Sequence, residues 1–587
     1  MTNPKLYLHY LGLAAAMALG AVLRFWHLDL KPLWMDEIIT AIFSFGQNYH
    51  DLPLNILFPL QRVSEIFTYQ SGISCEQIAE NLANQSTHPP LFFCAMYRWL
   101  GWMIPLGSHW VAKLRSLPAV FGVGTIGAIY FVNRTAFSPT SGIIAALIMA
   151  VSPFAVYLSQ EARHYTMPMF LITLALLGLM QIQQDIFEQQ RIRVWVVILW
   201  SIVNSIGFYV HYFFILAFIA EIITLLVLTY SGKTKLLKKG KTSLILVLSI
   251  IGVVISFFPW LPVMFSHFQS AETNWLPATM HIAPLYQTLI GWILMVISLP
   301  VENQPLLITA TCGFLMLSFG IWLGWEVWKG LKLLWLDNKT HLATLTLLSF
   351  TIVVLMQFVG IAYLLDKDIT VVPRYNFVYY PSFAALLAAS ISKIHKSKFI
   401  TLVVGILSCI FVVSNLVLQK PFQPEQVAQK MNLEPSVPLM LVVGYDNYQD
   451  VALGLSFALA LAKVRGNTNI GVLVSLNNFD SLAFLDKSLY SSAFWNRLNQ
   501  IPTPVTDQMN LWIVSPGMRK RDYPQDVGLS GDSVCTIDIA QHYRIGVPYQ
   551  LYRCNKIRQV TGAAITAPSA SLNTRGMIKP PIVGEMG

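Results

Sequence analysis

Residues 8–37 read LHYLGLAAAMALGAVLRFWHLDLKPLWMDE, and this stretch places a long apolar segment shortly before a pair of acids. Residues 8–27 carry almost no charge, and about 20 such residues can cross the roughly 30 Å of a bilayer core. The stretch ends on Asp36 and Glu37. It therefore predicts a membrane span followed by carboxylates at one membrane surface.

The composition of the whole chain extends this reading. Of its 587 residues, 55% are hydrophobic and only 12% are charged, whereas a soluble surface needs far more charge. The net charge of +10 could suggest a nucleic-acid partner, but the lysines and arginines cluster in short connections between apolar segments, as in cytoplasmic loops. We therefore expect a polytopic membrane protein and no nucleic acid. Six scattered cysteines show no metal spacing.

Apolar segments predict about eleven membrane spans. The first is read as a span, because no convincing signal-peptide cleavage site follows it. With the N-terminus inside, the C-terminus lies outside, and the lysine-rich stretch SGKTKLLKKGK marks the clearest cytoplasmic loop. The predicted spans are 8–27, 113–133, 140–158, 166–183, 194–209, 212–230, 242–262, 304–327, 342–364, 376–392 and 398–418.

Two further apolar stretches would place the lysine-rich loops on the wrong side of the membrane if they were spans. If the segment from His88 (HPPLFFCAMYRWLGWMIPL) or that from Pro284 (PLYQTLIGWILMVISLP) crossed the membrane, the lysine loops after it would lie outside. We therefore predict that both are helices at the outer interface. The alternative, that both cross and the parity is restored elsewhere, stays open.

The chain changes character near residue 420. We predict a transmembrane domain over 1–419, with a first outer loop at 28–112, a small extracytoplasmic α/β domain over 420–560, and a disordered tail at 561–587. The stretches VPLMLVVGYDNYQD, NIGVLVSL, NLWIVSPG and YQLYRCN predict strands, with a helix near 451–464. A disulfide between Cys535 and Cys554 fits the oxidising side.

The unusual polar residues fall on the outer face in this topology. Each one alone has an ordinary structural explanation: acids at a helix N-terminus, a turn before a helix, a local ion pair, or an arginine and aromatics at the interface. Their common location favours a site. The residues gathered there are Asp36, Glu37, His88, Glu161, Arg163, His164, His211, Arg374 and Tyr375.

Five short motifs in order carry a resemblance to a known family. They are LWMDE, HPPLFF, VSPFAVYLSQEARHYTM, HYFFIL and VPRYNFVYYP. Together they resemble the polyprenyl-phosphate-dependent glycosyltransferases of the GT-C fold, especially the protein O-mannosyltransferases and the lipid A aminoarabinose transferases. The resemblance covers roughly residues 8–400. It implies a GT-C-like membrane domain with interfacial helices.

The resemblance also implies a function. The chain is expected to move a sugar from a polyprenyl-phosphate donor to a hydroxyl of an acceptor protein, lipid or glycan. The enzyme is expected in the cell membrane, with its site and its C-terminal domain outside the cytoplasm. A lipid-linked donor keeps its tail in the bilayer, so the chemistry belongs at the interface. A transporter or flippase, and a polysaccharide polymerase or ligase, remain the alternatives.

The expected site has two sets of residues. Asp36 is the candidate base for the acceptor hydroxyl, and cations and hydrogen-bond donors would receive the departing phosphate. The chain departs from the aminoarabinose transferases at His88, where they carry a lysine, and near Tyr165, where they carry an aspartate. No cofactor is expected, although a divalent metal at the three acids is an alternative. The catalytic set is Asp36, Glu37 and Glu161, and the substrate-binding set is His88, Arg163, Tyr165, His211, Arg374 and Tyr375.

Overall fold

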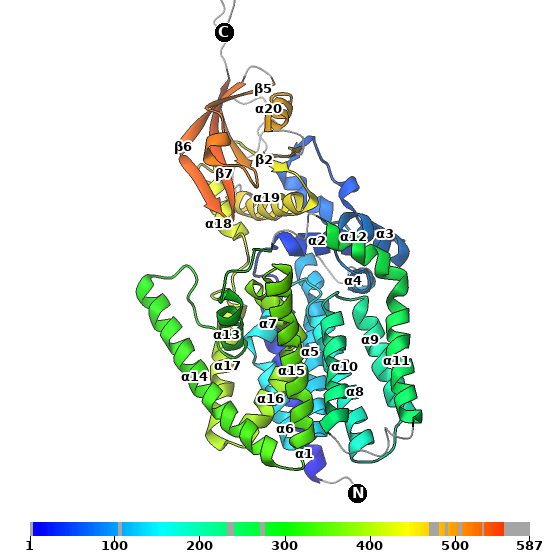
Figure 1. Ribbon diagram of the computed structural model, residues 1–587. Coiled ribbons are helices and arrows are strands. Elements are labelled where there is room, and N and C mark those ends of the chain that lie inside the picture. Colours follow the sequence, from blue (N-terminus) through cyan, green and yellow to red (C-terminus); the bar gives the residue numbers. More distant parts are fainter. Residues whose placement is uncertain are drawn as a thin grey trace, which may run out of the picture.

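In the computed structural model, a bundle of apolar helices carries a mixed β-sheet at one end, and the chain's N-terminus lies at the other end (Figure 1). The structure describes residues 4–103, 109–231, 240–270, 276–468, 480–487, 491–502, 508–530 and 533–556. Most of the predicted lysine loop, the predicted strand NIGVLVSL and the predicted tail lie outside these residues. The predicted fold class, a polytopic helical membrane protein with a C-terminal sheet domain, is confirmed.

Every predicted span is helical. Among the described residues, seven helices are long and apolar enough to cross a membrane, or eight if a bent pair counts as one span. The pair is α6 (Pro139–Ala150) and α7 (Pro153–Ser159), bent by 58°. The seven are α1 (Pro4–Phe25), α5 (Trp110–Ala136), α8 (Thr166–Phe187), α11 (Lys241–Phe257) continuing into α12 (Leu261–Gln269), α14 (Leu306–Leu336), α15 (His341–Leu365) and α17 (His395–Val413).

The other apolar helices are shorter. Three of them match predicted spans: α9 (Val194–Phe208), α10 (Phe214–Ser231) and α16 (Tyr380–Ser392). The two predicted interfacial segments form α4 (Leu91–Met103) and α13 (Ala283–Val296). At 1.5 Å per residue these two are about 20 Å long, which is shorter than the roughly 30 Å bilayer core, as is α16 with 13 residues. The predicted interfacial placement therefore fits their length.

A buried arginine stabilises the bend between α6 and α7. Because α7 starts at Pro153, which has no backbone N–H, the carbonyls at the end of α6 need other partners. Arg24 of α1 supplies them, with Nη2 donating to the Met149 carbonyl at 2.8 Å and Nη1 to the Ala150 carbonyl at 3.0 Å. The bent pair leads directly into the segment that carries Glu161 and Arg163.

The first outer loop folds into short helices beside the end of the bundle. A disulfide joins Cys75, the first residue of α3, to Cys94 in α4, a pairing that the sequence analysis did not anticipate. The loop contains α2 (Met35–Ser44), α3 (Cys75–Gln85) and the 3-10 helices Tyr49–Asp51 and Leu60–Phe67. Further 3-10 helices are Phe258–Trp260, Ile369–Val371, Pro373–Val378 and Lys520–Asp522.

The sheet combines parallel and antiparallel strands. Within the described residues its order is β1-β3-β2-β4-β7-β6-β5, with β2 parallel to β3 and β4 and the remaining pairs antiparallel. The strands are β1 (Leu57–Pro59), β2 (Leu439–Tyr445), β3 (Ser481–Asp486), β4 (Gln508–Val514), β5 (Asp526–Leu529), β6 (Ser533–Ile545) and β7 (Val547–Lys556). The helices with them are α18 (Pro424–Met431), α19 (Tyr448–Thr468) and α20 (Ser491–Asn499).

The centre of the sheet follows the sequence pattern, whereas one edge does not. Predicted strands appear as β2, β4 and β7, and the predicted helix lies within α19. The predicted Cys535–Cys554 disulfide joins β6 to β7. Along β2, Leu441 packs into the core on the α19 side, and Met440 and Val442 pack on the α20 side. The edge strand β1 comes from the first outer loop, so that loop and the sheet domain share one hydrogen-bonded sheet.

One buried ion pair holds the sheet domain together and gives a stability prediction. Arg465 of α19 donates to both carboxylate oxygens of Asp480 at 2.8 and 2.6 Å and to the Val437 carbonyl at 2.7 Å. Arg465→Met leaves a buried carboxylate unpaired, and we expect the free energy of unfolding of this domain to fall by about 3–5 kcal/mol. Thermal unfolding of the solubilised full chain measures this. The control is Arg553→Met, which removes a half-exposed ion pair and is expected to change stability by less than about 1 kcal/mol. Equal losses of stability for the two substitutions would contradict the role given to the buried pair.

Candidate active site

The predicted acid pair lies in the first turn of α2, where carboxylates are favoured by the helix dipole. Consecutive helical residues point about 100° apart, so two adjacent acids meet different surroundings. Glu37 is completely buried, whereas the side chain of Asp36 keeps 12% of its surface exposed. The pair therefore divides into one enclosed carboxylate and one that is partly exposed.

Glu37 forms a two-pronged ion pair with Arg115 of α5. Arg115 Nε donates to Glu37 Oε1 and Nη2 donates to Oε2, both at 2.8 Å. The backbone N–H of Ala162 donates to Glu37 Oε1 at 2.8 Å, and Lys420 Nζ lies 3.4 Å from Oε2. Burial alone would raise the pKa of Glu37, but Arg115 and Lys420 overcome it and lower the pKa to about 2. Glu37 is thus an ionised and fully occupied carboxylate.

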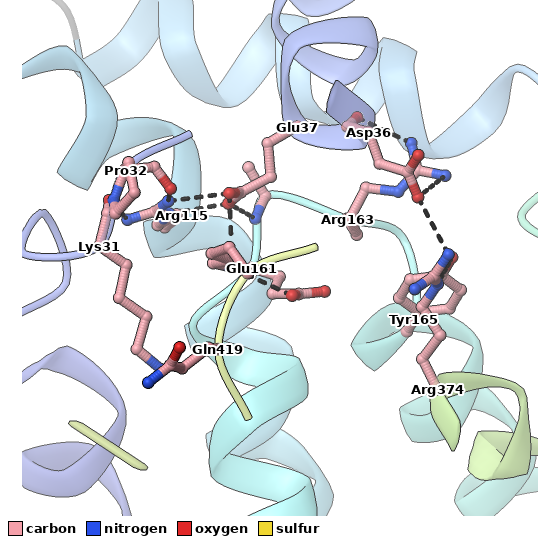
Figure 2. A network of polar contacts seen from close by, with 12 residues as sticks. Lys31, Pro32, Asp36, Glu37, Arg115, Glu161, Arg163, Tyr165, Arg374 and Gln419 are labelled. Atoms are coloured by element: carbon pink, nitrogen blue, oxygen red, sulfur yellow. Dashed lines mark hydrogen bonds and ion pairs between the residues drawn. The ribbon is translucent and has the colours of Figure 1, made fainter. Parts of the chain in front are cut away.

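Arg115 uses its remaining donors on the chain that leads into α2. Its Nη1 donates to the carbonyls of Leu28 and Lys31 at 2.9 and 2.8 Å, and its Nη2 donates to the Pro32 carbonyl at 3.1 Å. Figure 2 shows the Arg115 guanidinium group between Glu37 and the Lys31–Pro32 segment. Because Arg115 fixes the approach to α2, it also fixes where Asp36 lies.

Glu161 joins the same enclosed network rather than the space around Asp36. Its Oε1 accepts a hydrogen bond from Lys420 Nζ at 3.0 Å. Lys31 is also buried nearby, and burial together with the neighbouring Lys420 ammonium lowers its pKa to about 7. We call Lys31, Glu37, Arg115, Glu161 and Lys420 the Glu37 network.

Two arginines from distant parts of the chain face Asp36. Arg374 Nη2 lies 3.4 Å and Arg163 Nη2 lies 3.7 Å from Asp36 Oδ2. Arg374 Nε donates to the Tyr165 hydroxyl at 2.9 Å, and its guanidinium lies over the Trp34 ring at 5.0 Å from the centroid. Both distances to Asp36 exceed the 2.7–2.9 Å typical of a charge-assisted hydrogen bond. The two arginines therefore approach Asp36 without being saturated by it (Figure 2).

Arg163 is held by the start of α2 and by His88. Its Nη1 donates to the Asp36 carbonyl at 3.0 Å and to Thr40 Oγ1 at 3.1 Å, and its Nη2 meets His88 Nε2 at 3.0 Å. An arginine can only donate, so His88 Nε2 accepts, and the neutral ring carries its proton on Nδ1. That nitrogen lies 2.8 Å from Ser86 Oγ.

Three histidines form an uncharged wall beside the arginines. The His164 ring lies 5.0 Å from His88 and 4.6 Å from His211 between centroids. Burial lowers the pKa of His88 and His164 well below the ordinary value, and burial with Arg163 lowers that of His211 to about 3. The histidines are therefore neutral near pH 7 and act through hydrogen bonds and shape.

The structure joins all nine predicted site residues by a continuous set of contacts. Six of them reach Asp36 directly or through Arg163, Arg374 and Tyr165; the Tyr375 ring, for example, lies 6.4 Å from that of Tyr165. Glu37 is the next residue along α2. Glu161 is linked through Lys420. The sequence analysis missed Arg115, Lys31 and Lys420. A charged residue near the start of a predicted span, such as Arg115, was a usable signal.

The expectation of no metal stays a prediction. Within the described residues, no group of three or more His, Cys, Asp or Glu side chains is arranged to hold a metal ion. Among the three predicted acids, Glu37 and Glu161 bind Arg115 and Lys420.

Comparison with known proteins gives the family context. Residues 87–260 match the family model described as dolichyl-phosphate-mannose-protein mannosyltransferase. The predicted resemblance is confirmed. The chain is a membrane glycosyltransferase that uses a lipid-phosphate-linked sugar, as its motifs predicted. The matched region includes His88, Glu161, Arg163, Tyr165 and His211, and α2 precedes it. No curated protein matches the sequence.

Solved structures with a similar course of the chain are distant in sequence. ArnT from Cupriavidus metallidurans, bound to undecaprenyl phosphate, has 11% identity and a TM-score of 0.47, covering 94% of this chain and 99% of that one. The Archaeoglobus fulgidus oligosaccharyltransferase, in complex with Zn and sulfate, has 13% identity and a TM-score of 0.44. That match covers 76% of this chain and 61% of the archaeal one.

The buried histidines predict a pH dependence of stability. Unfolded His211 takes up a proton near pH 6.5, but the folded side chain does so only near pH 3, so stability present above pH 6.5 is lost as the pH falls toward 3. At pH 5 the loss from His211 is about 2 kcal/mol. We expect His211→Asn to flatten the fall in melting temperature between pH 7 and pH 5. Exposed His50→Asn is the control, and an unchanged slope for His211→Asn would contradict the prediction.

Proposed function

We propose that the chain transfers a sugar from its polyprenyl-phosphate donor to an acceptor hydroxyl at the extracytoplasmic face, with Asp36 as the general base. The observation that carries this proposal is the position of Asp36, whose partly exposed carboxylate lies 3.4 Å from Arg374 and 3.7 Å from Arg163. A base and an anion site side by side are what displacement of a lipid phosphate by a hydroxyl requires.

The proposed step is one displacement at the anomeric carbon. Asp36 accepts the proton of the acceptor hydroxyl while the acceptor oxygen forms its bond to that carbon. The bond between the carbon and the phosphate oxygen breaks, and its electron pair leaves with the lipid phosphate. One carboxylate acting as base in one displacement inverts the anomeric centre, by analogy with inverting glycosidases.

Arg163 and Arg374 are suited to receive the phosphate. A guanidinium group can bind two phosphate oxygens at once, and it stays charged at all relevant pH values. The Nε of Arg163 is buried and has no hydrogen-bond partner among the described residues, so this guanidinium group is not fully paired. Neutral His88 and His211, with Tyr165 and Tyr375, would add shape and weaker hydrogen bonds around the sugar.

Glu37 and Glu161 have a different role in this proposal from the one predicted for them. Both are completely buried and bound to cations, so neither can take a proton from an acceptor without breaking an ion pair. They are better suited to positioning: Glu37 aligns α2 against Arg115 and Ala162, and Glu161 anchors the segment that carries Arg163.

A transporter is less well supported. Transporters place ionisable groups near the bilayer midplane, and Glu221 is an acid within α10, one of the helices that match predicted spans. Its Oε2 accepts hydrogen bonds from Trp200 Nε1 at 2.7 Å and Asn204 Nδ2 at 3.1 Å, which are contacts between packed helices. A polymerase or ligase would use the same chemistry with a glycan acceptor, so the choice among protein, lipid and glycan acceptors concerns the acceptor alone.

The extracytoplasmic location is supported by two disulfides. Cys75–Cys94 lies in the first outer loop, and Cys535–Cys554 lies in the sheet that shares β1 with that loop. Disulfides persist in oxidising compartments and are rare in the cytosol. The first outer loop, which carries Asp36, and the sheet domain each contain one of these bonds. We therefore place both on the extracytoplasmic side of the cell membrane.

Substitution of Asp36 tests the proposed base. Asp36→Asn keeps the size of the side chain but removes the proton acceptor, and we expect kcat for transfer to fall by about 10²–10⁴-fold, with the melting temperature measured alongside to verify that the variant is folded. Radiolabelled polyprenyl-phosphate sugar and a hydroxyl acceptor provide the assay. Half-exposed Asp29→Asn serves as control. Retention of full transfer by Asp36→Asn would end the assignment.

Cysteine labelling tests the sidedness. In a Cys312→Ser/Cys409→Ala background with both disulfides retained, we expect Arg62→Cys in intact cells to react with a membrane-impermeant maleimide. Lys339→Cys, in the α14–α15 connection, is expected to react only after permeabilisation. Reaction of both positions from the same side would be incompatible with the proposed topology.

A further inference from the structure

Lys420 enters the Glu37 network from the segment that joins the bundle to the sheet domain. This segment, 414–423, runs between α17 and α18. The side chain of Lys420 is only 2% exposed, and its Nζ lies 3.0 Å from Glu161 Oε1 and 3.4 Å from Glu37 Oε2. Lys420 thus bridges Glu37, which is next to Asp36 in the chain, and Glu161, which lies two residues before Arg163.

The backbone of this segment is held in an unusual shape. Four of its residues, none of them glycine, have positive φ angles, a conformation that costs on the order of 1–3 kcal/mol for each and persists only where the surroundings enforce it. They are Asn415 (58°), Leu418 (51°), Phe422 (63°) and Gln423 (42°). The segment is therefore a shaped connection rather than a loose linker.

Contacts on both sides of Lys420 enforce that shape. On the membrane side, the backbone N–H of Gln419 donates to Glu302 Oε2 and Asn303 Nδ2 donates to Gln419 Oε1, both at 2.7 Å. On the sheet side, the Phe422 ring packs directly against Gly546, which lies in the β6–β7 turn with φ +75°. The position of the sheet domain thereby sets the position of Lys420.

The sheet domain also rests on the element that carries Asp36. Helix α19 packs against α2, and Ser456 Oγ donates to the Leu33 carbonyl at 2.7 Å, three residues before Asp36. The Tyr448 ring stacks on Tyr49 at 4.4 Å. The domain is therefore docked on the site both through α19 and through Lys420.

Removing Lys420 would leave the Glu37 network short of positive charge. Arg115 neutralises Glu37, but Glu161 is completely buried and has Lys420 as its ion-pair partner. A buried carboxylate without a cation takes up a proton or shifts toward another cation. Either response would move the segment that carries Arg163. The charged groups facing Lys420 are Lys31, Glu37, Arg115 and Glu161, with Glu302 beside the neighbouring Gln419.

We propose that Lys420 is a positioning residue through which docking of the sheet domain holds the site in its active arrangement, so that sugar transfer depends on the docked domain. This inference rests on the proposed function. It assigns the C-terminal domain a part in catalysis that does not require the domain to touch the donor.

The test compares lysine variants of the full-length protein. We expect Lys420→Met to lower kcat at least 10-fold with the KM for the polyprenyl-phosphate sugar changed less than about 3-fold, and Lys420→Arg to keep kcat within about 3-fold of wild type. Lys430→Met is the matched control, because Lys430 lies over the Tyr543 ring within the sheet domain at 4.3 Å. Wild-type kcat for Lys420→Met, or equal losses for both methionine variants, would overturn the proposal.

A double variant separates positioning from failure to fold. If the unneutralised Glu161 causes the loss, Glu161→Gln combined with Lys420→Met will show a higher melting temperature and a higher kcat than Lys420→Met alone. No recovery in either quantity would contradict the proposed route. If the wild-type protein transfers no sugar, the proposed function fails, whereas the melting temperatures still report on the Lys420–Glu161 coupling.

A remote pair of glycine variants tests the dependence on the docked domain. A Cβ on Gly546 would overlap the Phe422 ring, so we expect Gly546→Ala to displace the segment and lower kcat at least 3-fold. Gly528→Ala, in β5 of the same sheet, meets no atom of the described residues within 4 Å and should keep the wild-type kcat. Wild-type kcat for Gly546→Ala would show that transfer does not depend on this contact.

Discussion

The buried ion pair between Glu37 and Arg115 is the interaction on which the rest of the outer site depends. Both side chains are fully buried, and burying two charges costs several kcal/mol per ion unless geometry and further hydrogen bonds compensate. Here they do, since Arg115 also binds the carbonyls of Leu28, Lys31 and Pro32, and Glu37 accepts from Ala162. One pair thus ties the approach to α2, α5 and the α7–α8 connection to a common point.

The contrast between Asp36 and Glu37 follows from helix geometry. Adjacent residues on α2 face different directions, so Glu37 points into the Arg115 contact while Asp36 faces Arg163 and Arg374. Two carboxylates one residue apart can therefore have different roles, because their surroundings differ. The positioning acid needs complete burial and full pairing, whereas a reactive acid needs access to a ligand.

Those features of the structure that depend on local sequence patterns and on the order of motifs along the chain could be predicted from the sequence. The length of the apolar segments predicted the helices. Assigning the loops to the two sides of the membrane placed Asp36, His88 and Arg374 on the same side, and the structure brings them together. Lys420 could not be found this way, since a lysine in a polar linker carries no periodicity and its partner Glu161 is 259 residues away. Strand β1 was not predicted for the same reason. Its three residues lie in a long outer loop and pair only with a strand that is distant in the sequence.

The charge of the site explains why its ion pairs differ in length. Within the enclosed network, carboxylates and cations meet at 2.8–3.4 Å, but around Asp36 two guanidinium groups share one carboxylate at 3.4 and 3.7 Å. This region therefore carries more positive than negative charge at the point where the structure leaves a donor of Arg163 without a partner. An anionic ligand would satisfy that excess, and a lipid phosphate brings such charge to a membrane surface. In the proposed mechanism the same two cations therefore face Asp36 in the resting site and receive the departing phosphate.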